Sequence, residues 1–269
     1  LLERFAGEPE KLYQRLPIKT ASPLVAPIIE LFFDAARKLP IFYTYDGWRT
    51  AERTCWVAKD LRPVADKVDL RLMAQPLQTA AWELINKFGV KEYTLSDHLR
   101  RLTSDLRAGQ SLSDGPPYLR TSEQLEQLYH VFENEFARRE DAKIVETPVF
   151  LDHRGLLWRA TQCLQTSDAT LVESLAESGL HFWVGDPRRF RYTAALIPTF
   201  ALPALWKAIR EQISKEKPLR DAPPWIDTPA KLYRLYRTIL RTREPINAAD
   251  MVGTAIRLDR YGQLCFPET

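Results

Sequence analysis

Histidines are the first residues of this sequence to consider for metal or acid–base chemistry. There are four of them, His98, His130, His153 and His181. Zinc sites usually hold pairs of His or Cys a few residues apart, and none of these histidines lies within four residues of another His or of a Cys. We therefore predict a solvated or singly hydrogen-bonded role for each, with His98 and His130 on the polar sides of helices and His153 in a turn.

Asp46 and Asp152 are the nearest approach to catalytic carboxylates. Each stands shortly before a glycine, Gly47 or Gly155, in a predicted tight turn. An aspartate in such a turn ordinarily accepts hydrogen bonds from its own backbone. We interpret both as turn-forming residues, because a catalytic residue need not recur in every copy of a repeated segment.

Nucleotide-binding and nucleophile motifs are missing from the sequence. It contains no GxxxxGK[ST], no GxGxxG and no GxSxG, and only ten glycines in all. A loop that cradles phosphate with its backbone needs more glycine than this. The sequence therefore predicts a protein that is not an enzyme and that holds neither cofactor nor metal.

A sequence motif that occurs twice, called the phrase below, must position Asp46 and Asp152. Each copy begins with Pro-aliphatic-Phe, at Pro40 or Pro148, and reaches a glycine after seven residues (47 − 40 = 7 and 155 − 148 = 7) before it ends in Trp-Arg. A trace of the phrase surrounds Gly262, and the steps between the glycines are 155 − 47 = 108 and 262 − 155 = 107. The signature residues are Pro40, Phe42, Asp46, Gly47, Trp48, Pro148, Phe150, Asp152, Gly155 and Trp158.

The same period appears in a helical segment. Adding 107 to the apolar positions Leu125, Leu128, Tyr129 and Phe132 gives Leu232, Leu235, Tyr236 and Ile239. The pattern predicts an α+β fold of about two tandem units of about 107 residues, followed by a truncated third. Each unit should hold a β-hairpin or small sheet packed with about four helices. The predicted segments are 1–38 (helical tail and lead-in helix), 39–120 (first unit), 121–226 (second unit) and 227–269 (start of a third).

Composition narrows the class of protein further. Apolar residues make up 45% and charged residues 27%, which is ordinary for a globular protein. The three scattered cysteines, Cys55, Cys163 and Cys265, suit buried thiols in a reducing compartment better than a disulfide framework. No apolar run approaches the roughly 18 residues of a membrane helix, so we expect no membrane association.

Positive charge is concentrated near the C-terminal end. Residues 187–243 hold thirteen Lys and Arg against four Asp and Glu, a balance of 13 − 4 = +9, whereas the whole chain carries +3. The candidate polyanion- or partner-binding residues there are Arg188, Arg189, Arg191, Arg234, Arg237 and Arg241. The first three alternate with aromatic residues, as in single-strand binders, and the last three share a helix face. A solvated helix face, a nucleic-acid contact and a contact with an acidic protein surface all remain open.

Several phrases resemble the repeat regions of large sacsin-like and NO VEIN-like proteins. They are Leu12-Tyr-Gln-Arg-Leu-Pro, Ser22-Pro, the segment from Leu39 to Arg49, Phe88-Gly-Val and Leu95-Ser-Asp-His-Leu. The resemblance covers most of residues 10–105 and extends more weakly over 121–213. It implies an intracellular chaperone or scaffold with an Hsp90-like ATP-binding domain elsewhere in the full protein. That domain's motifs have no match here, so no ATP-binding residue is carried over.

We therefore expect a non-catalytic repeat module of a sacsin-like scaffold, excised from a longer chain. Its partners would be other domains of the same protein and a further protein, in the cytoplasm, or in the nucleus if the source is eukaryotic. The alternative is a nucleic-acid-binding module that uses the basic 187–243 region, for example in a bacterial defence or DNA-processing protein.

Trp48 and Trp158, which follow the two turns, are interpreted as packing anchors. Superposing residues 39–105 on 147–213 should place Gly47 over Gly155 and Trp48 near Trp158. Replacing Trp158 with Ala is expected to lower the free energy of unfolding by about 3–5 kcal/mol, because a buried indole would leave a cavity. Urea unfolding measures this loss, and a loss under about 1 kcal/mol would instead indicate an exposed ring.

Overall fold

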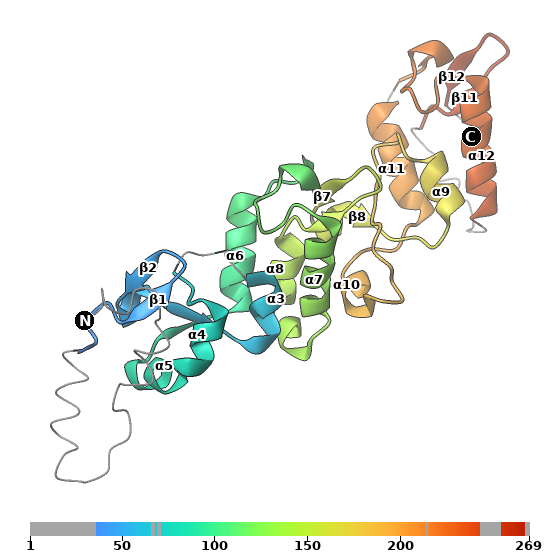
Figure 1. The fold of residues 1–269 in the computed structure, drawn as a ribbon. Helices are drawn as coiled ribbons and strands as arrows, with labels where there is room; N and C mark the ends of the chain where they lie inside the picture. The colour runs from blue at the N-terminus through green and yellow to red at the C-terminus, as the bar shows by residue number, and fades with distance from the viewer. Residues whose placement is uncertain (1–35, 66–67, 69–70, 214, 243–253, 267–269) are drawn as a thin grey trace, which may run out of the picture. The chain divides into compact units, whose positions relative to one another are not determined.

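The computed structural model, drawn in Figure 1, describes residues 36–65, 68, 71–213, 215–242 and 254–266. The fold is α+β, with short strands and short helices. Contacts divide the chain into unit 1 (Leu1–Asp105 with Gly115–Lys143) and unit 2 (Leu106–Asp114 with Ile144–Thr269). The lead-in helix predicted within 1–38 lies outside the described residues, except for positions 36–38.

The described residues contain hairpins at all three predicted places. They pair β1 (Phe42–Thr44) with β2 (Gly47–Arg49), β6 (Phe150–Leu151) with β7 (Leu156–Trp158), and β11 (Arg257–Leu258) with β12 (Gln263–Cys265), all antiparallel. Each turn contains a glycine at positive φ, Gly47 at 93° and Gly155 and Gly262 at 78°. A glycine reaches this region without the steric penalty of a side chain, which explains why the turns form where they do.

A third strand completes two of these sheets, and it comes from earlier in the chain. β5 (Gln110–Ser111) pairs with β7, and β10 (Lys217–Pro218) pairs with β12, both antiparallel. The first positions of the two added strands differ by 217 − 110 = 107. Helices separate each added strand from its hairpin along the chain, among them α7 (Ser122–Phe132) in one case and α12 (Pro229–Arg241) in the other.

Parallel pairing holds the middle of each unit. In unit 1, β3 (Cys55–Val57) pairs with β4 (Lys91–Tyr93), and Cys55 also bridges to Leu72. In unit 2, β8 (Cys163–Leu164) pairs with β9 (His181–Phe182). A buried cysteine begins the central strand in both units, so these two thiols are core residues, as predicted.

The remaining elements are helices. The α-helices are α3 (Arg62–Ala65), α4 (Gln75–Ala80), α5 (Trp82–Phe88), α6 (Leu95–Asp105), α8 (Asp141–Glu146), α9 (Ala169–Ser174), α10 (Arg191–Ala195) and α11 (Leu202–Gln212). The 3-10 helices are η2 (Ala51–Arg53), η3 (Lys59–Leu61), η4 (Leu112–Asp114), η5 (Glu135–Glu140), η6 (Ala160–Gln162) and η7 (Leu219–Asp221). Within the described part of the chain, every helix falls short of the length and apolarity needed to cross a bilayer.

Helix starts repeat at the same interval as the strands. The first positions of α6 and α11 differ by 202 − 95 = 107, and those of α3 and α9 differ by 169 − 62 = 107. α7 and α12 are capped by Thr121 and Thr228, whose hydroxyls accept the backbone N–H three residues on. The offset between these caps is again 228 − 121 = 107, so a capping Thr starts the corresponding helix of each segment.

An apolar cluster is buried among the described residues of each unit. In unit 1 it gathers the hairpin residue Phe42, Met73 and the inner faces of α4 and α5. In unit 2 it joins Phe182, α11 and α12, with Trp206 at 2% exposure. Helix α7 contacts α3 within unit 1, and α12 contacts α9 within unit 2. The boundaries of the compact units therefore differ from those of the predicted segments.

The hairpin turns differ by one residue, and this overturns one expectation. Phe42 pairs with Arg49, whereas the corresponding Phe150 pairs with Trp158. Trp158 is therefore the counterpart of Arg49, and Trp48 lies one position away. Adjacent strand residues point to opposite faces, so the two tryptophans occupy opposite faces of their hairpins and the prediction that they overlie one another is wrong.

Gly155 allows a test of the turn. Replacing it with Ala should lower the free energy of unfolding by about 1–2 kcal/mol, because an L-residue at positive φ is strained. An added Cβ would meet nothing within 4 Å, so the cost is in the backbone alone. Gly155→Asn is the matched comparison and should lose less, since Asn tolerates this conformation better. Equal losses in urea unfolding for both variants would contradict the assignment.

Candidate functional site

Asp152 is the centre of the most elaborate polar arrangement in unit 2. Its side chain is fully buried, and Oδ1 accepts the backbone N–H groups of Arg154 (2.9 Å) and Leu156 (3.0 Å). Oδ2 accepts the indole N–H of Trp158 at 3.0 Å. The turn thus wraps around the carboxylate, as the sequence predicted for an aspartate in this position.

Two further side chains reach the same oxygen. His181, from β9, places Nδ1 3.2 Å from Oδ2, and the Arg154 guanidinium lies 3.4 Å from Oδ2 and 2.8 Å from the same histidine nitrogen. The Trp158 ring stacks on the imidazole, with ring centroids 3.5 Å apart and planes at 21°. We call Asp152, Arg154, Trp158 and His181 the Asp152 cluster.

The electrostatics of this cluster favour a permanent charge on Asp152. Burial alone would raise the carboxyl pKa, but the hydrogen bonds from His181, the backbone of Leu156 and Arg154, and Trp158 hold that pKa well below its usual range. Both oxygens are already occupied by donors. A carboxylate so placed is a poor proton acceptor, and its effect is to tie the β6–β7 hairpin to β9.

Cys163 lies beside the cluster and is also buried. Burial, and to a smaller degree the charge of Asp152, raises the pKa of its thiol to about 12. Nucleophilic cysteines need a depressed pKa and access to solvent. Cys163 has neither property, so it is a core thiol.

The corresponding turn positions in the other hairpins are simpler. Thr44 is the position offset from Asp152 by 152 − 44 = 108, and its hydroxyl accepts the N–H of Asp46 (3.3 Å) and donates to the carbonyl of Gly47 (2.9 Å). Asp259, offset in the other direction by 259 − 152 = 107, accepts two backbone N–H groups at 2.8 Å. The counterpart of Asp152 is therefore Thr44. Asp46 instead forms a solvent-exposed ion pair with Arg49.

The histidines divide between expected and unexpected places. His130 is exposed on α7, and His153 lies in the hairpin turn, 2.9 Å from the carbonyl of Ala176. His98 is 1% exposed, so its predicted place on a polar helix side is wrong. Helix spacing explains the error, because His98 shares the buried face of α6 with Leu95, Leu99 and Leu102. Burial lowers its pKa to about 4, so it is neutral at pH 7.

Metal coordination finds no support among the described residues. No three His, Cys, Asp or Glu side chains within that part of the chain are grouped so as to hold an ion. The signature phenylalanines Phe42 and Phe150 begin the first strand of their hairpins and are fully buried, so they are structural residues.

The basic helix α12 lines an open groove. Its apolar side, Leu232, Leu235 and Ile239, is buried in the unit 2 core. Arg234, Arg237 and Arg241 are exposed and line a groove of about 430 Å³ between α9 and α12, together with Tyr233, Glu173 and other small polar residues. Within the described part of the chain, no carboxylate forms an ion pair with any of the three arginines.

The second basic tract is not part of this groove. Arg188 and Arg189 are exposed just before α10, Arg191 is exposed as its first residue, and none of them lines the space between α9 and α12. Phe190 between them is 2% exposed, and the Arg189 guanidinium lies 5.0 Å from the centre of its ring. The Phe190 ring is therefore not presented to solvent as a stacking platform, and the six candidate arginines form two separate surfaces.

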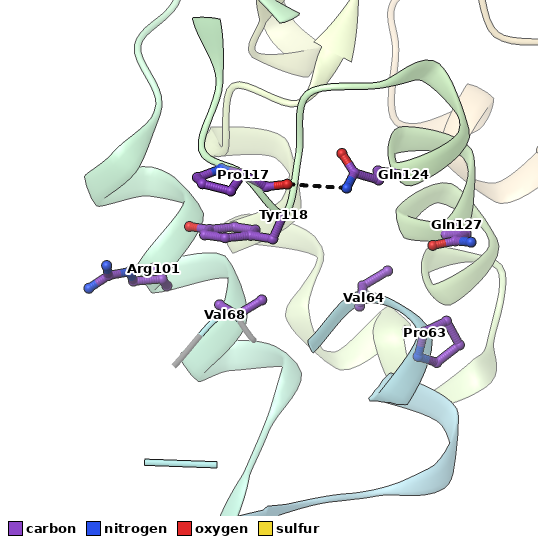
Figure 2. Close-up of a pocket in the computed structure, with 8 residues that line it drawn as sticks. All are labelled: Pro63, Val64, Val68, Arg101, Pro117, Tyr118, Gln124 and Gln127. Atoms are coloured by element: carbon purple, nitrogen blue, oxygen red, sulfur yellow. Dashed lines mark hydrogen bonds between the residues drawn. The ribbon is translucent and has the colours of Figure 1, made fainter. Parts of the chain in front are cut away.

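Unit 1 has a groove at the corresponding place, between α3 and α7. Figure 2 shows Pro63 and Val64 on one side of it and Gln124 and Gln127 on the other, around a volume of about 460 Å³. The offset of 107 relates Pro63 to Thr170 and Gln127 to Arg234. The interhelical groove thus recurs, but its lining changes from a single arginine, Arg101, to three arginines. In the sequence this difference falls at exposed positions such as Gln127 and Arg234, and the 107-residue match of apolar positions does not include them.

Tyr118 forms one wall of the unit 1 groove. Its hydroxyl donates to Asp105 at 2.5 Å, and burial together with that carboxylate raises the tyrosine pKa. Gln124 donates to the carbonyl of Pro117 at 3.2 Å, as the dashed line in Figure 2 shows. These hydrogen bonds satisfy polar groups of the wall, and Arg101, which also lines the groove, is paired with Asp105 at 2.8 Å.

Comparison of the chain with protein-family models, with curated proteins and with solved structures found no match.

Asp152→Asn is expected to lower the free energy of unfolding at pH 7 by about 2–3 kcal/mol, because charge-assisted hydrogen bonds in the cluster are lost. The folded-state pKa of Asp152 lies below the unfolded value of about 3.9, so its contribution is present above that pH and is lost as pH falls below it. The gap between wild type and variant should therefore narrow below about pH 4.

Asp46→Asn is the matched control, because it removes an exposed carboxylate whose one ion pair is with half-exposed Arg49. Surface pairs of this kind contribute roughly 0–1 kcal/mol. Urea unfolding across pH 3–7 measures both variants. A pH-independent gap for Asp152→Asn, or equal losses for the two, would contradict the role given to Asp152.

Proposed function

We propose that this chain is a non-catalytic repeat module that binds a protein partner through the α9–α12 groove. The observation that carries the proposal is that an interhelical groove recurs at corresponding places in the two units. The buried helix positions beside it match, whereas the exposed residues that line it differ. The buried positions of α7 and α12 match at an offset of 107, Leu125 with Leu232 and Leu128 with Leu235, while the groove position changes from Gln127 to Arg234.

A repeated frame with a variable exposed lining is the usual arrangement in repeat proteins that recognise partners. The groups best suited to chemistry support the non-catalytic part of the proposal. Asp152 is saturated with donors, His98 is buried and neutral at pH 7, and Cys163 is a buried thiol. Each is occupied in holding the fold.

The composition of the α12 face favours an acidic protein segment as partner. Tyr233 is 63% exposed and Leu240 is 71% exposed. At 100° per residue both lie beside the arginine row, so the face combines cations with two large apolar groups. Tyr and Arg are enriched at protein interfaces, and the helical spacing of the arginines matches carboxylates spaced on a partner helix.

The wider context is the sacsin-like scaffold that the sequence phrases resemble. In such a protein the module would sit among other repeats and contact neighbouring domains as well as an external partner. The nucleic-acid alternative rests on the same three arginines, whose exposed row can meet phosphates. The burial of Phe190 counts against base stacking on that ring at the 188–191 tract.

The test compares two polyanions on one surface. A helical peptide with Glu at i, i+4 and i+7 beside Leu, and a single-stranded and a duplex oligonucleotide, are titrated into the chain across a salt series. We expect the peptide to bind, and the variant Arg234→Ala/Arg237→Ala/Arg241→Ala to weaken it by about tenfold or more, since three exposed pairs each contribute up to about 1 kcal/mol.

The control is Arg188→Ala/Arg189→Ala/Arg191→Ala, which removes the same charge from the other basic tract and should leave peptide affinity within about twofold. Tighter binding of either oligonucleotide, with a steep salt dependence lost in the α12 variant, would establish the nucleic-acid alternative instead. Absence of peptide binding at low salt would refute the proposed function.

A further inference from the structure

The second hairpin carries a further strand along the outer edge of β6. The carbonyl of Leu151 accepts the N–H of Val184 at 3.1 Å, and the N–H of His153 donates to the carbonyl of Phe182 at 3.0 Å. The pairing is antiparallel. The end of β9 and the residues that follow it therefore extend the β5–β7–β6 sheet by one strand.

The first hairpin is covered in the same way. The N–H of Tyr45 donates to the carbonyl of Leu72 at 3.2 Å, and Thr44 bridges antiparallel to Met73. Tyr45 is the counterpart of His153, at the offset 153 − 45 = 108. In both hairpins, a segment from later in the chain thus lies along the same edge.

The third hairpin presents the same backbone groups with no strand against them. β11 pairs with β12 in the register of β6 with β7, shifted by 257 − 150 = 107 residues. The carbonyl of Leu258 therefore faces away from β12, as that of Leu151 faces away from β7. Within the described part of the chain, neither this carbonyl nor the N–H of Arg260 has a hydrogen-bond partner. Unpaired groups of this kind at a sheet edge are a template for another strand.

Tyr236 defines where the open part of this edge begins. Helix α12, which carries this tyrosine, lies beside the β11–β12 hairpin (Figure 1), and the tyrosine hydroxyl donates to the carbonyl of Ile256 just before β11. The open groups, on Leu258 and Arg260, are those nearest the turn. They occupy the same two positions that bind the added strand in the second hairpin.

Asp259 makes this edge suited to a strand that carries a histidine. Its Oδ1 accepts two backbone N–H groups of the turn, both at 2.8 Å, as Oδ1 of Asp152 does. Cys265 stands in the position of Trp158, at the offset 265 − 158 = 107, and its thiol interacts with the Asp259 carboxylate. Among the described residues, nothing takes the place of His181, which β9 contributes to Asp152.

The chain's own histidines are already placed elsewhere in the described structure. His181 is paired with β8, His98 and His130 lie in α6 and α7, and His153 lies in the second hairpin turn. A second copy of the chain would bring the same occupied residues. The strand that fits this edge therefore comes from a partner segment and not from a second copy of the described fold.

We propose that the β11 edge binds an extended strand of a further repeated segment, one that follows the His-Phe-Trp-Val pattern of residues 181–184. An N–H of that strand donates to the Leu258 carbonyl, one of its carbonyls accepts the Arg260 N–H, and its imidazole meets the Asp259 carboxylate. In strand addition, main-chain hydrogen bonds give affinity and alternate side chains give specificity. The site uses none of the arginines of the α9–α12 groove and does not rest on the function proposed for that groove.

The experiment titrates the chain into a dye-labelled peptide of residues 178–186 and follows fluorescence anisotropy. We expect saturable binding with a dissociation constant below about 1 mM. Arg260→Pro should weaken binding by about tenfold, because it removes the N–H that bonds to the peptide. Arg260→Ala is the matched control: it removes the same guanidinium, keeps the N–H, and should leave the affinity within about twofold.

Proline is compatible with the fold at position 260. Arg260 is the second residue of a four-residue turn, which the Gly262 N–H closes on the carbonyl of Asp259 at 3.2 Å. Proline is favoured at that position of a turn. Thermal unfolding checks that both variants are folded.

A second variant tests the histidine contact by a route that does not depend on proline. Asp259→Asn keeps a side-chain oxygen for the turn but removes the charge. It should weaken the peptide by about fivefold or more and leave the affinity for a His181→Ala peptide within about twofold, because that peptide lacks the interacting group. A variant that merely distorted the turn would weaken both peptides equally.

Three results would overturn the inference. One is no binding of the peptide by the wild-type chain at millimolar concentration, and another is equal affinity of the Arg260→Pro and Arg260→Ala variants. The third is a concentration-dependent dimer that Arg260→Pro abolishes, since the occupant of the edge would then be a second copy. The variant Arg234→Ala/Arg237→Ala/Arg241→Ala should bind this peptide normally, so failure of this inference is distinguishable from failure of the proposed function.

Discussion

Short strands are the constraint on which the described structure depends. The strands have two or three residues each, as in β1 (Phe42–Thr44) and β8 (Cys163–Leu164). A hairpin of this size is at best marginal in water unless further strands or helices cover it. Each of the hairpins β6–β7 and β11–β12 therefore pairs with an additional strand. This strand is β5, which precedes α7 in the chain, or β10, which precedes α12. The helices supply the apolar cover that the small sheets lack.

This arrangement explains why compact units and sequence segments do not coincide. If a segment is defined to begin at its hairpin, the strand and the helix that complete the hairpin's sheet and core lie earlier in the chain and fall outside that segment. Packing instead joins α7 to α3 and α12 to α9, across the predicted boundaries near 121 and 227. In the tandem array that we propose, each segment would rely on its neighbour for part of its sheet and core. The common offset of strands, helices and caps supports that interpretation.

Buried polar groups likewise depend on hydrogen-bond partners from other segments. The Asp152 carboxylate gathers two backbone amides and the side chains of Trp158, Arg154 and His181, so a buried charge is compensated from several directions. In the first hairpin, Thr44 occupies this position with a hydroxyl that needs fewer partners. The exposed surfaces, by contrast, vary freely: the grooves beside α7 and α12 share a frame, and their linings differ in charge.

The sequence by itself determined what depends on local chemistry. Glycines such as Gly155 set the turns, Thr121 and Thr228 start their helices, and the apolar spacing of Leu232, Leu235 and Ile239 gives the buried side of α12. These signals act within a few residues, so the α+β character, the hairpins and the exposed arginine row were all readable without a structure.

Tertiary structure alone decided the positions that depend on register and on distant pairing. One extra residue in the second turn puts Trp48 and Trp158 on opposite faces, because side chains alternate along a strand. His181 meets Asp152 only because β9 pairs with β8. No local pattern records which remote segments will pair, and that pairing is what assembles the Asp152 cluster.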